Sequence, residues 1–462
     1  MDAGVNVAIA HLADGRPEFF TKREYLVKEQ LATLDWLRQE FELVESKVIV
    51  SSQGISDFAR QVARSRAQSL IIHLPIWADP IFSLKLNSQL PLPVLLLGNE
   101  RPDTSSIVGI LGAGGALDQV GSQHIRIFEH TSRESRRSVI AFARAAAVRS
   151  QLRGQVFGQF GGRSLGIVTA MADPTQWMQL FGVDTESFDQ MEIVEVAKGL
   201  PAEEVECHLN WLVQRLAGVE YDGKFTSAVL ERQVRSYIAT KKLIKKYQLD
   251  FIGVKCQSEL SDGYVTQCVA HMLTNGSLDA EGEKAPVVHA CESDVDGALT
   301  MQILHLLSGG KPAALLDVRW FDRKNGTWTL ANCGALAADF FASESDPSGL
   351  SNVTMMAHVF GRGGGGALSA MASPQPVTMA RLCRKSGEYW MAIVSGEVVK
   401  RDREELKRTT GVFPQVFVKT SAGIDFARVL GSNHIHLVSG NYTEELINFC
   451  RLVSIPWQAW NS

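Results

Sequence analysis

The 462-residue sequence lacks any apolar run of the roughly 20 residues that a helix needs to cross a bilayer. Its first residues, MDAGVNVAIAHLADGR, lack the basic start and the long apolar core of a secretory signal. Charge of one sign is also missing, because 46 Lys and Arg face 50 Asp and Glu for a formal net charge of -4. We therefore expect a cytoplasmic protein with no membrane partner and no nucleic-acid partner.

Paired cysteines are also absent. The number of cysteines is odd and none has CxxC spacing, which argues against a zinc finger and against a disulfide scaffold. We expect reduced and mostly buried thiols. The seven are Cys207, Cys256, Cys268, Cys291, Cys333, Cys383 and Cys450.

The pattern of apolar runs predicts an α/β fold with two parallel-sheet domains and a strand-rich, β-barrel-like C-terminal domain. Residues 1–153 alternate apolar strands with amphipathic helices, which predicts a Rossmann-like sheet covered by helices. A second such series is predicted over 154–322, beginning with a strand at 165–171. Short strands with polar turns fill 323–462.

Two acidic residues stand at the ends of neighbouring predicted strands. Glu292 follows the strand 285–291 and Asp317 ends the strand 311–317. In one parallel sheet these ends would meet at the edge where ligands collect, so we expect the two carboxylates to face one crevice. Gln257 holds the matching place after the strand 249–255.

Asp294 and Asp296 have a simpler explanation than catalysis. Both precede or begin the predicted helix that leads from Glu292 to Asp317, where acidic residues cap the first turn.

Two carboxylates at one edge repel each other unless a cation or a proton lies between them. Oxygen ligands with one imidazole suit Mn²⁺ or Mg²⁺. The candidates for the imidazole are His434, His436 and His358, and spacing alone leaves a structural role for any of them open. His434 and His436 alternate along a predicted strand and would point to one face.

Several short motifs resemble the L-fucose isomerase / L-arabinose isomerase family, and its fucose-type branch in particular. They are ACE at 290–292, DGALTM at 296–301, DVR at 317–319, GAGGALDQVG at 112–121, NCG at 332–334, PVTMARL at 376–382 and the pair Asn433-His434. The resemblance implies an aldose–ketose isomerase in which Glu292 and Asp317 are metal ligands and the acid/base pair, and His434 is the third ligand.

The resemblance also implies contacts with the sugar. They would come from Gln257, Asn433 and Arg16, and from Trp77 of a neighbouring subunit. The resemblance also implies a homo-oligomer, with a hexamer favoured. We also assign His358 and Arg362 to the substrate site. Mn²⁺ is the expected cofactor, with Mg²⁺ or Co²⁺ as alternatives.

Three functions stay open at this point. The first is isomerisation of a deoxy or otherwise modified sugar through an enediol intermediate. The second is the same reaction on an anionic sugar such as a sulfonated hexose (a sulfoquinovose-type isomerase), suggested by Arg362 in a glycine-rich segment. The third is a non-catalytic sugar-binding protein. We interpret the glycines at 112–115 as a structural turn, and the segment 360–369 as a flexible active-site loop.

Overall fold

The computed structural model describes residues 4–402, 404 and 413–460. The chain divides into two compact units. Unit 1 comprises Met1–Gln151 with Glu444–Ser454, and unit 2 comprises Leu152–Thr443 with Ile455–Ser462. The finer division into three predicted domains stays a prediction. Within the described part of the chain, no helix has the length and apolar character needed to span a bilayer.

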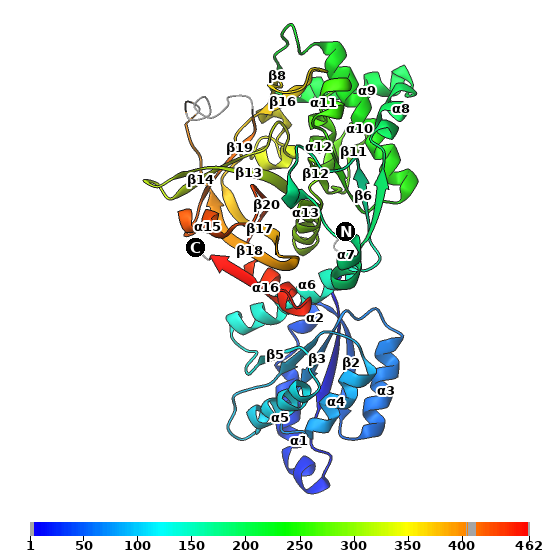
Figure 1. Ribbon diagram of the computed structural model, residues 1–462. Helices are drawn as coiled ribbons and strands as arrows, with labels where there is room; N and C mark the ends of the chain where they lie inside the picture. The colour runs from blue at the N-terminus through cyan, green and yellow to red at the C-terminus, as the bar shows by residue number, and fades with distance from the viewer. Residues whose placement is uncertain (1–3, 403, 405–412, 461–462) are drawn as a thin grey trace. The chain divides into compact units, whose positions relative to one another are not determined.

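Unit 1 is a parallel sheet with the strand order β2-β1-β3-β4-β5, flanked by helices (Figure 1). The central strands β3 and β4 are buried along their whole length, as expected of a parallel sheet covered on both faces. The strands are β1 (Asn6–Leu12), β2 (Glu42–Ile49), β3 (Ser69–His73), β4 (Val94–Leu97) and β5 (His124–Ile127). The helices are α1 (Pro17–Ala32), α2 (Leu37–Glu40), α3 (Ser52–Ala63), α4 (Pro80–Gln89), α5 (Ser106–Gln119), α6 (Arg133–Leu152) and α16 (Thr443–Leu452).

The predicted glycine turn at 112–115 is wrong, because these residues lie inside α5. Gly114 leaves room for a neighbouring side chain and forms no turn. A Cβ on Gly114 would stand 2.2 Å from Nε of Arg126 on the next strand.

The first part of unit 2 is a second parallel sheet with the order β12-β9-β6-β7. Its strands are β6 (Val156–Phe160), β7 (Asp184–Phe188), β9 (Phe251–Val254) and β12 (His289–Cys291). The series therefore starts at β6, and the predicted strand at 165–171 is wrong. That segment is a loop with one short 3-10 turn, η1 (Val168–Ala170), and Leu165 and Gly166 have positive φ values that a strand does not allow.

The second part of unit 2 is a closed antiparallel barrel of six strands in the order β17-β20-β13-β14-β19-β18, with β17 pairing back to β18. The predicted fold class is thereby confirmed. The barrel strands are β13 (Ala313–Asp322), β14 (Thr327–Ala331), β17 (Gln375–Lys385), β18 (Glu388–Val398), β19 (Gln415–Lys419) and β20 (His434–Ser439). A further strand, β21 (Trp457–Trp460), pairs with β18 in parallel.

The remaining elements of unit 2 surround the two sheets. The helices are α7 (Pro174–Phe181), α8 (Met191–Lys198), α9 (Ala202–Arg215), α10 (Ser227–Tyr247), α11 (Glu259–Gly263), α12 (Cys268–Asn275), α13 (Val295–Leu307) and α15 (Ile424–Val429), with 3-10 turns η2 (Ala338–Phe341) and η3 (Leu350–Asn352). The small sheets pair β10 (Leu278–Asp279) with β11 (Gly282–Glu283), and β15 (Thr354–Ala357) with β8 (Gly218–Val219) and β16 (Gly366–Ser369).

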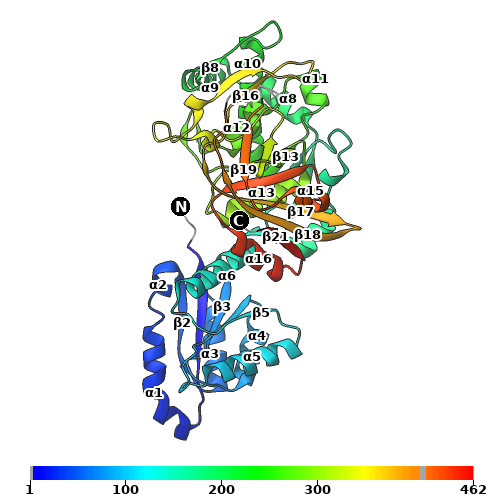
Figure 2. The same ribbon diagram turned by 90° about the vertical axis from the view of Figure 1, so that its left-hand side faces the viewer.

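Helix α13 joins the parallel sheet to the barrel. It contacts β9 and β12 on one side and β13, β17 and β20 on the other, and both ribbon views show it beside the barrel strands (Figures 1 and 2). Nearly all of its side chains are buried, which its apolar composition allows. The end of β12 and the barrel strands are therefore held close together, and the candidate site lies at this junction.

Candidate active site

Glu292, Asp317 and His434 come together in unit 2, although they lie far apart in the sequence. Oε2 of Glu292 is 3.4 Å from Nε2 of His434, and Oδ1 of Asp317 is 3.6 Å from the same nitrogen. His434 and Glu292 are buried, and the Asp317 side chain keeps about a quarter of its surface exposed. The two acids and the imidazole thus form one cluster, in which Asp317 is the most exposed member.

The structure corrects how the two carboxylates meet. We expected the strands of Glu292 and Asp317 to be neighbours in one parallel sheet, but β13 is a barrel strand, paired antiparallel with β14 and β20. Asp317 faces Ala331 of β14 and His434 of β20 in register. The carboxylates therefore approach across the junction between two sheets, and barrel register brings Asp317 to His434.

Glu292 has a strained backbone. Its φ is 58° and that of Ser293 is 50°, in the left-handed region that non-glycine residues rarely adopt. The turn is held by the Ser293 N–H, which donates to the Val254 carbonyl at 3.1 Å, and by Gln159 Nε2, which donates to the Ser293 hydroxyl at 3.1 Å. Strain of this kind costs on the order of 1–3 kcal/mol for each residue and is found where function requires a side chain to be aimed.

Asp294 supports the site in a way that sequence reasoning missed. It does cap α13, since Oδ1 accepts from the Gly297 N–H at 3.0 Å. It also bonds Nδ1 of His434 at 2.7 Å and the guanidinium of Arg381 at 2.5 and 3.1 Å. Asp294 fixes the imidazole so that Nε2 faces Glu292 and Asp317, as carboxylates do behind metal-binding histidines.

A signal for this arrangement was present in the sequence. Arg381 stands in the apolar run PVTMARLC, and an arginine inside a buried strand requires an acidic partner. Asp296, the other predicted cap, is buried and bonds Arg384 and Tyr389 instead.

The charges of the site are strongly coupled. Burial opposes protonation of His434, but its hydrogen bonds with Asp294 and Glu292 raise its pKa to about 10. Burial also raises the pKa of Asp317, and Glu292 adds to this while His434 lowers it. For Asp294, burial alone would raise the pKa, but Arg381 and His434 hold it well below its usual value. Without an added cation, the imidazole therefore supplies the positive charge between the two acids.

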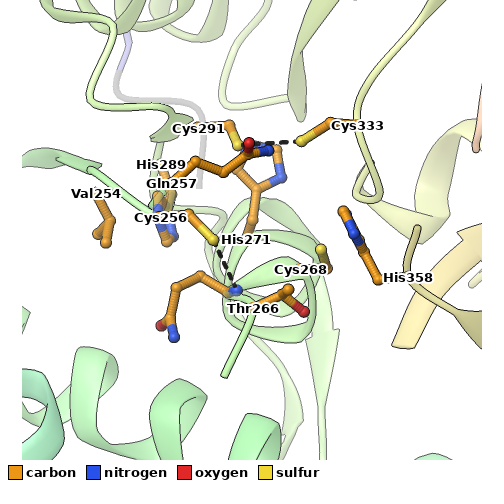
Figure 3. Close-up of a pocket in the computed structure, with 11 residues that line it drawn as sticks. Val254, Cys256, Gln257, Thr266, Cys268, His271, His289, Cys291, Cys333 and His358 are labelled. Carbon is orange, nitrogen blue, oxygen red and sulfur yellow. Dashed lines mark hydrogen bonds between the residues drawn. The ribbon is translucent and has the colours of Figure 1, made fainter. Parts of the chain in front are cut away.

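Two predicted substrate residues lie close to this centre. Asn433 precedes β20 and its amide donates to Oδ1 of Asp317 at 3.1 Å. Gln257 follows β9, and its carbonyl accepts from the Ser164 hydroxyl at 3.0 Å. Gln257 and His358 line a small cavity together with Cys291, the residue before Glu292 (Figure 3).

The other predicted residues have different surroundings. Arg362 is exposed and pairs with Asp262 at 3.5 Å. Its glycine-rich segment packs tightly, since Gly365 has a φ of 153° and a Cβ there would stand 1.8 Å from Oγ1 of Thr266. His436 is fully buried, with Nε2 at 3.9 Å from Asp294.

Arg16 and Trp77 belong to unit 1. The Arg16 guanidinium bonds Asp14 at 2.6 Å and lies 5.3 Å from the Trp77 ring centroid. The two predicted contacts therefore neighbour each other, and their role at the substrate site stays a prediction.

The buried histidines beside the site make the stability of the protein sensitive to acid. Burial lowers the pKa of His271 to about 4, against about 6.5 in an unfolded chain. The unfolded chain therefore takes up a proton that the folded chain refuses, and stability falls as the pH drops from 6.5 to 4. We expect urea unfolding, measured at several pH values, to show this loss of stability. The His271→Leu variant should lose less of its free energy of unfolding over the same pH range. An equal change of the unfolding free energy with pH in the wild type and in His271→Leu would contradict the low pKa of His271 as the cause.

The donor types of Glu292, Asp317 and His434 fit a divalent ion of the manganese or magnesium kind. The distances between their side chains are those of hydrogen-bonded pairs. Among the residues that the structure describes, no three His, Cys, Asp or Glu side chains are spaced to hold an ion. Rotation of these side chains would be needed to close them on a cation.

Comparison with known proteins agrees with this picture. The model of the L-fucose isomerase C-terminal domain matches residues 330–461, which include four of the six barrel strands, the end of β14 and His434. A sulfoquinovose isomerase of Priestia aryabhattai is 21% identical over 470 residues, covering 98% of this chain and 99% of the relative. An L-fucose isomerase of Phocaeicola vulgatus is 23% identical over 446 residues, covering 78% and 75%. The chain is therefore similar to fucose isomerase-like proteins over its barrel and to sugar isomerases over most of its length, and these relatives indicate an aldose–ketose isomerase.

Proposed function

We propose that this protein is a metal-dependent isomerase of a deoxy or otherwise modified aldose, working through an enediolate of the sugar. The observation that carries the proposal is the approach of the Glu292 and Asp317 carboxylates to one imidazole nitrogen, at 3.4 and 3.6 Å. Interconversion of an aldose and a ketose moves one proton between neighbouring carbons and another between their oxygens. Two carboxylates within reach of one sugar can perform both transfers.

The residues of the chain have separate tasks in this reaction. Glu292 and Asp317 accept and return protons. Asn433, bonded to Oδ1 of Asp317, is placed to bind a sugar hydroxyl beside that carboxylate. Asp294 and Arg381 hold His434 in one orientation from inside the fold.

Glu292, Asp317 and His434 would hold Mn²⁺, or Mg²⁺ or Co²⁺ in its place. A divalent cation there would stabilise the negative charge that develops on the sugar oxygens. The charges of these residues support the proposed need for an ion, since two acids in a largely buried site otherwise rely on a protonated imidazole.

His434→Ala should lower the affinity for Mn²⁺, because it removes the only nitrogen of the proposed ligand set. Mn²⁺ content after dialysis measures this directly, with His305→Ala as the control, since His305 lies at the other end of α13. Unchanged occupancy in His434→Ala would move the nitrogen ligand to another histidine.

A sulfonated hexose is the second candidate substrate. The relatives that match almost the full length of the chain carry the name sulfoquinovose isomerase. The identity of 21% leaves the substrate of this chain to experiment.

The test is ketose formation from a panel of neutral and anionic aldoses, each with added Mn²⁺ and with a chelator. We expect turnover only with the metal. Preference for 6-deoxy aldoses supports the first candidate, and preference for sulfoquinovose supports the second. Sugar binding without turnover under either condition would refute the proposal in favour of a binding protein.

We further propose that the protein acts in the cytoplasm as a homo-oligomer, with a hexamer favoured, in which Trp77 completes the site of a neighbouring subunit. Sedimentation combined with activity tests this. Full activity in a monomer would contradict it.

A further inference from the structure

Beside the candidate active site, thiols and imidazoles surround a small cavity (Figure 3). It contains a free volume of about 10 Å³, which is room for a single water-sized molecule. The proposed reaction uses none of the sulfur atoms there. The lining includes four cysteines and three histidines: Cys256, Cys268, Cys291, Cys333, His271, His289 and His358.

Two of these thiols point toward each other. Sγ of Cys291 and Sγ of Cys333 are 4.0 Å apart, and Figure 3 shows them facing across the cavity. Cys291 is the last residue of β12, and Cys333 lies two residues beyond the end of β14. Cys333 is partly exposed, whereas the other three cysteines of the cavity are buried. A small molecule from solvent therefore meets Cys333 first.

The surroundings of Cys333 favour its reactive form. Burial opposes protonation of the neighbouring His358, but Cys268 and Cys333 raise the pKa of its ring to about 10, so the ring carries a positive charge beside the thiols. Cys291, with its sulfur at 4.0 Å, and the neighbouring His358 lower the pKa of Cys333 to about 6. A thiolate beside an imidazole is the form of cysteine that attacks peroxides.

We propose that Cys291 and Cys333 form a peroxide-sensitive pair that closes to a disulfide and switches off the adjacent active site. The Cys333 thiolate attacks hydrogen peroxide, an S–O bond forms as the O–O bond breaks, and hydroxide leaves. The peroxide is reduced and Cys333 is oxidised to a sulfenic acid. The Cys291 thiol then gives up its proton and attacks the Cys333 sulfur. The S–S bond forms, and the sulfenic oxygen leaves with that proton as water.

The pair joins the two segments that carry the catalytic acids. Glu292 directly follows Cys291, and Ala331, two residues before Cys333, is the register partner of Asp317. A disulfide requires an S–S distance of about 2.05 Å, so the sulfur atoms must approach by roughly 2 Å. Side-chain rotation absorbs part of this movement and the backbone before Glu292 absorbs the rest. Displacement of a catalytic group by about 1 Å can cost about 100-fold in rate.

The effect on activity rests on the proposed function, whereas the formation of the bond does not. The experiment therefore measures both on the full-length protein. Reduced protein is treated with hydrogen peroxide and blocked with an alkylating reagent, and its peptides are mapped by mass spectrometry. Isomerisation is measured before oxidation, after it, and after added dithiothreitol.

Three variants give the controls. Cys333→Ser removes the attacking sulfur, Cys268→Ser removes a neighbouring thiol of the same cavity, and Cys207→Ser removes an exposed cysteine in α9. We expect a Cys291–Cys333 peptide in the wild type, in Cys207→Ser and in Cys268→Ser, with a fall in kcat/KM of about ten-fold or more that dithiothreitol reverses. Cys333→Ser should resist peroxide.

Oxidation confined to Cys207, or a pair that uses Cys268 in place of Cys291, would overturn the proposed pair. A disulfide at Cys291–Cys333 with unchanged kcat/KM would overturn its coupling to the active site. If the untreated protein isomerises no sugar, the proposed function fails, and the peptide map still decides whether the pair exists.

Discussion

Glu292→Gln is expected to lower kcat of the sugar isomerisation by about 10²–10⁴-fold, the usual contribution of a general acid or base. The amide has nearly the same shape as the carboxylate but takes up no proton, and it ligates cations poorly. Since Glu292 lies 3.4 Å from Nε2 of His434, the change also removes one of the negative charges that face the imidazole. The measurement is steady-state kinetics with saturating Mn²⁺, on the aldose that the panel selects.

A matched control is available for the Glu292 change. Glu283→Gln makes the same chemical change at an exposed position in β11 and should leave kcat unaltered. Asp317→Asn should match Glu292→Gln in direction, because Asp317 approaches the same nitrogen from the barrel. Near-normal turnover in either site variant would remove that residue from the acid/base pair.

Asp294→Ala is expected to lower the free energy of unfolding by about 3–5 kcal/mol, the cost of leaving one member of a buried ion pair alone. Asp294 and Arg381 are 0% and 1% exposed, so the change leaves a buried guanidinium without its ionic partner. Urea unfolding measures the loss. Asp425→Ala, which breaks an exposed pair with Arg428, should change stability little.

A double variant separates the ion pair from other roles of Asp294. Asp294→Ala with Arg381→Met removes both charges, so it should be more stable than Asp294→Ala alone. Binding of Mn²⁺ should stay weak in the double variant, because His434 has still lost the bond at 2.7 Å that orients it. Recovery of metal binding together with stability would mean that Asp294 acts on the fold alone.

The residues proposed for the site could be chosen from local sequence. Glu292 and Asp317 stand at strand ends, and strand ends in α/β proteins collect functional side chains for a general geometric reason. Asn433 and His434 were found through a resemblance of motifs. The α/β series and the strand-rich end of the chain were also predictable, because apolar periodicity is a local property.

The sequence by itself therefore determined the fold class and most of the strands, and it proposed which residues carry the chemistry. Only the tertiary structure decided how they meet. Strand propensity does not determine which strands pair. The sequence therefore placed β13 in the parallel sheet, whereas its pairing with β14 and β20 makes it part of the barrel. The bonds from Asp294 to His434 and Arg381 span 140 and 87 residues. Contacts of that separation depend on the packing of α13 between two sheets, which no local pattern encodes.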